Sequence, residues 1–250
     1  MPSDQRVLPE AAQLERVASL LEADRVLDAL AAARETGPLA HWAWGEPATL
    51  AARLLSWTGG QRESTCLHLL NWRHRPDDDQ ALLFALFHHR AGRGPLWALR
   101  TIRQRLDGPP AATPAVQAEL LAFHATMLAS YRDFASAHAA IDTALTLAPE
   151  APWIWTEYAD VHARQDAWEA SLAAIEHALE LRPGYRPAVL AKANALVSCQ
   201  RESEAIRLCE AAHERSQNGH YALQVSAIWS ARDDAEQSAQ IGRASCRERV

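Results

Sequence analysis

Two stretches of this 250-residue chain share one pattern: AIDTALTLAP at residues 140–149 and AIEHALELRP at residues 174–183. Their final prolines, Pro149 and Pro183, have a 34-residue spacing, and Ala144 and Ala178 keep the same spacing. Alanine and leucine favour the α-helix, and a proline at the end of such a stretch stops it. The aromatic residues Phe134 and Trp168, which open each of these helices, repeat at this spacing too. The pattern therefore predicts a repeating 34-residue helix-turn-helix unit.

This unit resembles the tetratricopeptide repeat (TPR), in which two antiparallel helices, A and B, form each repeat. When the terminal proline is taken as position 32, Ala159, Ser171 and Ala178 fall at positions 8, 20 and 27. Small residues are needed there because the two helices cross closely, and larger side chains would force them apart. The resemblance implies an all-α fold, a TPR-like right-handed α-solenoid of antiparallel helix pairs.

The same frame extends in both directions from the central repeats. Glycines at residues 59 and 60 and at residues 92 and 94 predict turns inside two earlier repeats, and Pro95 predicts a helix start. Residues 1–44 predict a further N-terminal helix pair, a degenerate repeat or a cap, and residues 113–117 predict a short insertion. The predicted array, residues 45–240, contains repeats at 45–78, 79–112, 118–151, 152–185 and 186–219 and a truncated repeat at 220–240.

The last ten residues, IGRASCRERV, do not continue the pattern. The helical periodicity stops after Gln240, and a back-translation of residues 241–250 resembles the adapter DNA that is ligated to fragments for sequencing. We therefore expect residues 241–250 to be a non-native tail, which does not enter the prediction of the fold. We also expect the natural protein to continue beyond Gln240.

Composition excludes several classes of protein. The formal net charge of −6 argues against binding to a nucleic-acid backbone, which needs a basic face. No apolar run approaches the length of a membrane span, and the N-terminus has no signal-peptide pattern. The four cysteines, at positions 66, 199, 209 and 246, lack paired spacing, which favours reduced thiols in a cytoplasmic protein.

The TPR resemblance also implies which residues face a ligand, because positions 2, 5, 9, 12 and 13 line the concave groove of TPR arrays. Aromatic side chains there give contact area, and asparagine and arginine hydrogen-bond a peptide backbone or carboxylate. No lysine stands at position 5, so a clamp for a C-terminal carboxylate is not expected. An unoccupied face and a face packed against a downstream domain remain alternatives. The predicted groove residues are Trp153, Thr156, Asp160, Arg164, Leu190, Asn194, Tyr221 and Gln224.

Catalytic and metal-binding patterns are weak. Cys66, His68 and His74 do not share a helix face, and Cys209 falls at position 24, a core position where cysteine acts as a small apolar residue. No histidine pair at i, i+4 and no Cys-x-x-Cys motif indicates a metal site, so we expect no metal and no cofactor. Trp42 and Trp44 predict a packing joint or an exposed aromatic patch.

The sequence therefore predicts a non-catalytic scaffold that binds a protein or peptide, or a downstream domain of the same chain, but no nucleic acid and no membrane. A second hypothesis rests on PWIWTEYADV at residues 152–161 and ALELRPGYRPAV at residues 178–189. These stretches are similar to the TPR arm of bacterial multidomain proteins that carry a cysteine-peptidase-like domain. The chain would then be the substrate-handling or regulatory arm of a truncated enzyme, and none of that domain's catalytic motif is present.

Overall fold

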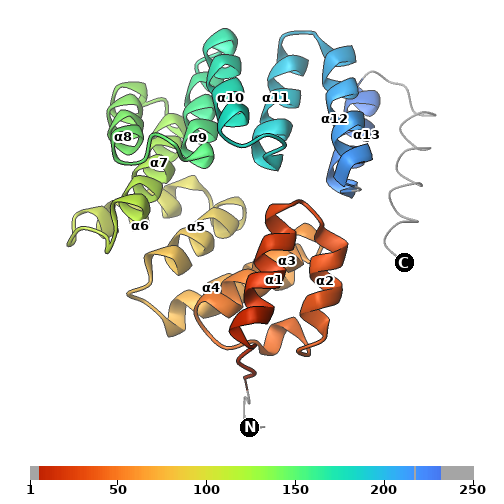
Figure 1. The fold of residues 1–250 in the computed structure, drawn as a ribbon. Helices are drawn as coiled ribbons and strands as arrows, with labels where there is room; N and C mark the ends of the chain where they lie inside the picture. The colour runs from red at the N-terminus through yellow and green to blue at the C-terminus, as the bar shows by residue number, and fades with distance from the viewer. Residues whose placement is uncertain (1–5, 217, 232–250) are drawn as a thin grey trace. The chain divides into compact units, whose positions relative to one another are not determined.

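The computed structural model describes residues 6–216 and 218–231, and the regular structure of these residues is helical (Figure 1). Within them, extended pairing is limited to an isolated bridge between Val7 and Trp42. The prediction of an all-α fold is confirmed. The elements are α1 (Ala11–Glu22), α2 (Val26–Arg34), η1 (Leu39–His41), α3 (Glu46–Trp57), α4 (Gln61–His74), α5 (Asp79–Arg93), α6 (Pro95–Leu106), α7 (Pro114–Ser130), α8 (Phe134–Leu147), α9 (Pro152–Ala163), α10 (Trp168–Leu181), α11 (Arg186–Ser198), α12 (Glu202–Ser216) and α13 (Gly219–Ala231).

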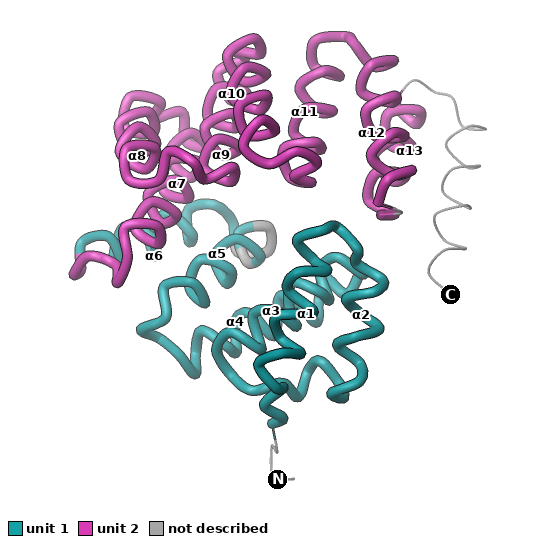
Figure 2. Tube along the Cα trace, viewed as in Figure 1, with its two compact units in different colours: residues 1–107 teal, residues 108–250 magenta. Residues whose placement is uncertain are grey.

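The chain divides into two compact units, residues 1–107 (unit 1) and residues 108–250 (unit 2) (Figure 2). Unit 1 contains the pairs α1–α2, α3–α4 and α5–α6, and unit 2 contains α7–α8, α9–α10, α11–α12 and the single helix α13. The first helix of each pair is called the A helix and the second the B helix. The first compact unit thus joins the N-terminal helix pair, predicted as residues 1–44, to the two pairs that follow it.

One type of turn closes the hairpins of unit 2. Arg132, Asp166 and Gln200 each adopt a left-handed conformation with φ near 60°, and they recur with the period of the repeat. The backbone N–H of the next residue donates to the carbonyl five residues earlier, which is the Schellman motif that ends helices. These hydrogen bonds join Asp133 to Leu128 (3.2 Å), Ala167 to His162 (3.1 Å) and Arg201 to Leu196 (2.8 Å).

Unit 1 uses the same turn twice and then replaces it. The N–H of Arg25 donates to the carbonyl of Leu20 (2.9 Å), and that of Gly60 donates to Leu55 (2.8 Å). The N-terminal pair α1–α2 is therefore closed in the same way as the repeats. Between α5 and α6, however, the turn is Gly94 alone, with φ 84° and ψ 157°, a conformation that glycine alone adopts readily. The predicted turn at Gly94 and helix start at Pro95 are confirmed, whereas Gly92, also assigned to this turn, lies inside α5.

The core of unit 2 repeats with the same period. Ala144, Ala178 and Ala212, at position 27 of successive repeats, are 0%, 0% and 3% exposed, as the crossing of small residues predicts. Positions 8, 20 and 24 are equally buried, so the helices of each pair meet along one line of small or branched side chains. These residues are Ala125, Ala159, Ala193, Ala137, Ser171, Ala205, Ile141, Ile175 and Cys209.

The core of unit 1 contains the tryptophan joint that the sequence predicts. Trp42 is fully buried among residues of α1, α2 and α3, so it packs the first helix pair onto the second. Trp44 is half-buried: its ring stacks on His74 at 4.3 Å, and the guanidinium of Arg6 lies 3.1 Å from the ring centroid. The alternative of an exposed aromatic patch is wrong for this pair.

Two predicted boundaries differ from the structure. Residues 114–117 form the first turn of α7, so the predicted insertion lengthens this helix at its N-terminus: Thr113 caps it by accepting a hydrogen bond from the N–H of Val116 (3.3 Å), and Pro114 stands at a first helical position. Helix α13 begins at Gly219, one residue before the predicted repeat start.

The second difference shifts the register of the last repeat by one residue. Positions 3 and 10 of the A helices of unit 2 are buried, and in the last repeat Tyr221 and Ile228 occupy them, whereas Ala227, which the predicted frame places at the small-residue position 8, is exposed. Tyr221 is the equivalent of Ala188 in α11. It lies one residue closer to Ala188 in the sequence than the 34-residue period of the repeat predicts. Residues 232–250, with the predicted break at Gln240 and the tail 241–250, lie outside the described residues. The corresponding buried pairs in the earlier A helices are Leu120 with Met127, Ile154 with Val161 and Ala188 with Ala195.

Candidate functional site

The A helices of unit 2 lie side by side, since α7 packs against α9, α9 against α11, and α11 against α13. On α9 and its C-cap, the predicted groove residues are spaced by three, four and four, which places them on one stripe of the helix. On α11 the two predicted residues are four apart. We call this surface the A-helix face and define it as Trp153, Thr156, Asp160, Arg164, Leu190, Asn194 and Gln224.

On α9 the face holds a surface ion pair beside an aromatic side chain. The Nε atom of Arg164 lies 2.7 Å from Oδ2 of Asp160, and the two side chains are 36% and 40% exposed. Thr156 is 9% exposed, and its hydroxyl donates to the carbonyl of Pro152 (2.9 Å), so it is turned toward its own helix. Trp153 is half-buried in the first turn of the helix.

Between α11 and α13 the face holds two amides in contact. Nε2 of Gln224 donates to Oδ1 of Asn194 at 2.7 Å. Among the described residues, the Nδ2 group of Asn194 and the Oε1 atom of Gln224 have no further hydrogen bond, so the pair keeps a donor and an acceptor for a ligand. Leu190, half-buried, precedes Asn194 by one turn of α11.

Tyr221 does not belong to this face. Its side chain is 1% exposed in the core with Val189 and Ala205, so its prediction as a groove residue is wrong. The register shift places Leu223, which is 42% exposed, and Ala227 at positions 5 and 9, two groove positions that the predicted register gave to other residues. The signal that could have found them is the pair of large apolar residues seven apart, Tyr221 and Ile228.

A second cluster of polar aromatics joins two neighbouring repeats. His138 of α8 lies 2.8 Å, Nε2 to Nε2, from Gln165 and 5.1 Å, ring to ring, from His162 of α9. The ring of Tyr158 lies 4.5 Å from that of His162. Burial raises the pKa of Tyr158, helped by Asp142. Burial, and then the neighbouring His138, lower the pKa of His162, whereas Asp142 opposes that change. The cluster packs α8 against α9.

A pocket of about 250 Å³ opens between α10, α11 and α12. It is lined by charged side chains that pair with one another: Nζ of Lys192 lies 3.2 Å from Glu176, and Nε of Arg201 lies 2.7 Å from Glu204. The hydrogen bond from Arg201 lowers the pKa of Glu204. None of the predicted groove residues lines this pocket. Its other lining residues are Leu172, Leu196, Arg207 and Leu208.

The residues considered for catalysis are not brought together. Cys66 is exposed on α4, whereas His68 on the same helix is fully buried and stacks on His88 at 4.5 Å. Cys209 is fully buried as predicted, and its burial raises the pKa of its thiol to about 11, so the thiol stays protonated at neutral pH.

Metal-ligand clusters and membrane-spanning helices were sought in the part of the chain that the structure describes. No group of three or more His, Cys, Asp or Glu side chains in residues 6–216 and 218–231 is placed to hold a metal ion. Likewise, none of the described helices combines the length and the apolar character that crossing a bilayer requires.

Comparison with known proteins identifies the fold. No protein-family model matches the sequence, and no curated protein matches it. A tetratricopeptide repeat protein from Parabacteroides merdae has a TM-score of 0.56 at 12% identity, over 94% of this chain and 91% of that one. A thermophilic TPR protein from Thermus thermophilus has a TM-score of 0.55 at 18% identity, over 76% of this chain and 100% of that one.

A monomeric mutant of IFIT1, solved with Gppp-AAAA, has a TM-score of 0.61 at 11% identity. The match covers 94% of this chain and 58% of that one. At these identities the likeness concerns the fold alone. This chain has the fold of TPR proteins, as the period of its sequence predicts.

Proposed function

We propose that this chain, with its TPR fold, is a non-catalytic scaffold that binds an extended peptide segment of a partner protein on the A-helix face. The observation that carries the proposal is the contact between Asn194 and Gln224, two amides on neighbouring A helices. A peptide backbone presents N–H and C=O groups alternately, and this pair can meet one of each. Leu190, one turn earlier on α11, and Trp153 on the neighbouring helix α9 supply apolar side chains.

The charges of the face favour an internal segment of the partner over its C-terminus. A free carboxylate is best held by an arginine or lysine that is not already paired. Here the guanidinium of Arg164 is held by Asp160, and the single lysine of the chain, Lys192, pairs with Glu176 outside the face. The expected ligand is therefore a neutral or mixed-charge segment that is recognised through its backbone and through apolar side chains.

The experiment is a selection of random peptides displayed on phage against the whole chain, followed by fluorescence anisotropy with the selected peptides. We expect Asn194→Ala to weaken binding about tenfold, which corresponds to the loss of about 1.4 kcal/mol. Glu210→Ala, an exposed change on the B helix α12, is the matched control and should leave the affinity within about twofold.

Either of two results would overturn the proposal. One is that no selected peptide binds with a Kd below about 1 mM, the range of non-specific contact. The other is that the selected peptides bind equally well to Asn194→Ala and to Leu190→Ser. IFIT1 was solved with Gppp-AAAA, but we propose no nucleotide ligand here, because the net charge of −6 opposes one. The cytoplasmic and bacterial setting predicted from the sequence remains part of this proposal.

A further inference from the structure

The two B helices α4 and α6 of unit 1 carry an excess of positive charge. Residues 1–107 have thirteen arginines and thirteen acidic residues, so unit 1 is neutral as a whole. Within α4 and α6, however, Glu63 is the sole carboxylate. Both helices pack against α5. Their arginines are Arg62 and Arg73 on α4 and Arg100, Arg103 and Arg105 on α6.

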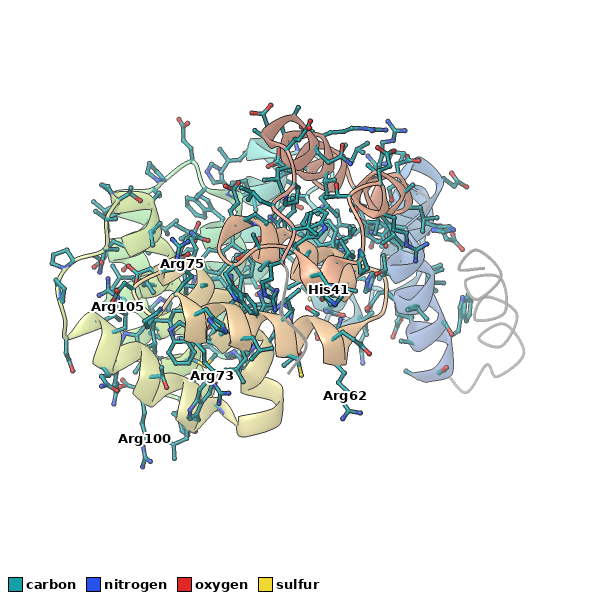
Figure 3. All side chains as sticks on the ribbon, turned by 90° about the horizontal axis from the view of Figure 1, so that it is seen from below. His41, Arg62, Arg73, Arg75, Arg100 and Arg105 are labelled. Carbon is teal, nitrogen blue, oxygen red and sulfur yellow. The ribbon has the colours of Figure 1, made fainter. Side chains whose placement is uncertain are left out.

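Some arginines of this region are neutralised by neighbours and others are not. Arg105 pairs with Asp79, and Arg75, which follows α4, lies 4.0 Å from Asp78. By contrast, Arg62, Arg73 and Arg100 are exposed, and no carboxylate of the described residues lies within 4 Å of their charged groups. Figure 3 shows Arg62 and Arg100 extending away from the ribbon on the same side.

Exposed leucines lie among these arginines. Residues 62, 66, 70 and 73 of α4 are spaced by four, four and three, so they form one stripe along about three turns, or roughly 16 Å. Leu70 on that stripe is 40% exposed, and Leu96, one turn before Arg100 on α6, is 46% exposed. We call this surface the cationic B face and define it as Arg62, Cys66, Leu70, Arg73, Leu96 and Arg100.

We propose that the cationic B face binds an acidic amphipathic helix of a partner protein. Arginine forms paired hydrogen bonds with carboxylates, and the leucines give an apolar strip between the charges. A helix with glutamates and leucines at intervals of three and four matches a surface built from helical stripes of the same spacing. Nucleic acid fits less well, since unit 1 has no net positive charge and duplex or single-strand binding needs many phosphate contacts.

The test uses the whole chain and a fluorescein-labelled synthetic helix of about 18 residues with glutamate and leucine at helical spacing. We expect measurable binding that weakens as salt rises. Arg73→Glu and Arg100→Glu should each weaken the binding about tenfold, and Leu70→Ser about threefold. Arg34→Glu makes the same charge change at an exposed residue of α2 and should leave the affinity within about twofold. Circular dichroism checks that each variant keeps its helices.

Four outcomes would overturn the inference. The peptide fails to bind, or Arg34→Glu weakens binding as much as Arg73→Glu, which would show a general charge effect. A scrambled peptide of the same composition binds equally well, which would remove the requirement for a helix. Polyuridylate binds more tightly than the peptide and is lost with Arg73→Glu, which would assign the face to nucleic acid. The peptide-selection experiment on the A-helix face concerns unit 2 and is independent of these results.

Discussion

Unit 2 and unit 1 fill the same repeat positions with different chemistry. At positions 20, 24 and 27, unit 2 has alanine or serine, isoleucine or cysteine, and alanine. The same positions of α4 in unit 1 hold Ser64, His68 and Asn71, each fully buried. The hairpin is therefore compatible with two kinds of core, one in which small side chains let the helices touch and one in which larger polar side chains are buried at the same positions and Asn71 is hydrogen-bonded.

Asn71 shows how the second kind works. Its Oδ1 accepts from the backbone N–H of Gly45 (2.7 Å), and its Nδ2 donates to the carbonyl of Gly45 (3.1 Å) and to the hydroxyl of Thr49 (2.9 Å). A buried amide is stable only when it is satisfied in this way. In α6, position 27 is Arg105, which pairs with Asp79 at the start of α5. In both pairs a polar side chain replaces the small residue and bonds to the A helix or to the residue before it.

Placing a core residue of one unit into the core of the other should cause the largest loss of stability. Ala178→Asn installs the unit 1 residue in unit 2, where no partner is positioned for its amide. Overpacking and an unsatisfied buried amide should together cost about 3–4 kcal/mol. Urea unfolding followed by circular dichroism measures it, and Ala173→Asn, an exposed change on the same helix, is the control. An equal effect of the two changes would contradict the small-residue core of unit 2.

The reverse exchange, Asn71→Ala, gives unit 1 the residue that unit 2 uses. We still expect a loss of about 2–3 kcal/mol, because the buried N–H of Gly45 loses its partner while its carbonyl keeps the bond from Thr49. The same unfolding measurement applies, with Cys66→Ala on the exposed side of α4 as control. Unchanged stability would show that the small residue suffices in both units.

Replacing the glycine of the turn between α5 and α6 should have a smaller effect on the free energy of unfolding than the core substitutions. Gly94 has a positive φ that other residues adopt with strain, and the space around its Cα is open, so Gly94→Ala should cost about 1–2 kcal/mol through the backbone alone. The exposed change Gln104→Ala on α6 serves as reference in thermal unfolding. If Gly94→Ala were neutral, the turn between α5 and α6 would not depend on glycine.

The smallest expected effect is the contribution of His162 to the pH dependence of stability. Since the pKa of His162 is lowered in the folded chain, the unfolded chain binds a proton more readily below pH 6.5. Stability from this residue is therefore present above that pH and declines as the pH falls. His162→Phe should reduce the loss of stability between pH 7.5 and 5.5 by less than about 1 kcal/mol. His41→Gln, at an exposed position, should leave that loss unchanged. An equal loss in wild type and His162→Phe would refute this role.

The sequence predicts unit 2 better than unit 1 for a physical reason. Alanines that touch at helix crossings must recur with the period of the fold, so Ala144, Ala178 and Ala212 reveal the frame directly. Asn71 and Arg105 satisfy the same positions through partners elsewhere in the chain, which no periodicity shows. The one-residue shift at α13 has a different cause, because a fixed period cannot show a shortened connection.

The two candidate faces also differ in how far the sequence predicts them. Helical spacing and the TPR resemblance predict that Asp160, Arg164, Leu190 and Asn194 share one surface, but the contact from Gln224 to Asn194 depends on how α11 and α13 pack. The cationic B face was hidden because the arginines of unit 1 are offset by an equal number of acidic residues. It is visible once the structure shows which arginines are already paired.

Hydrogen exchange on the whole chain, with and without a peptide selected on it, tests most directly the claim that unit 2 binds its partner through A helices. The account predicts slower exchange of backbone amides in α9 and α11 when the peptide is bound, because ligand binding suppresses local opening of the elements it contacts. Slowing confined to the B helices α10 and α12, with α9 and α11 unchanged, would contradict it.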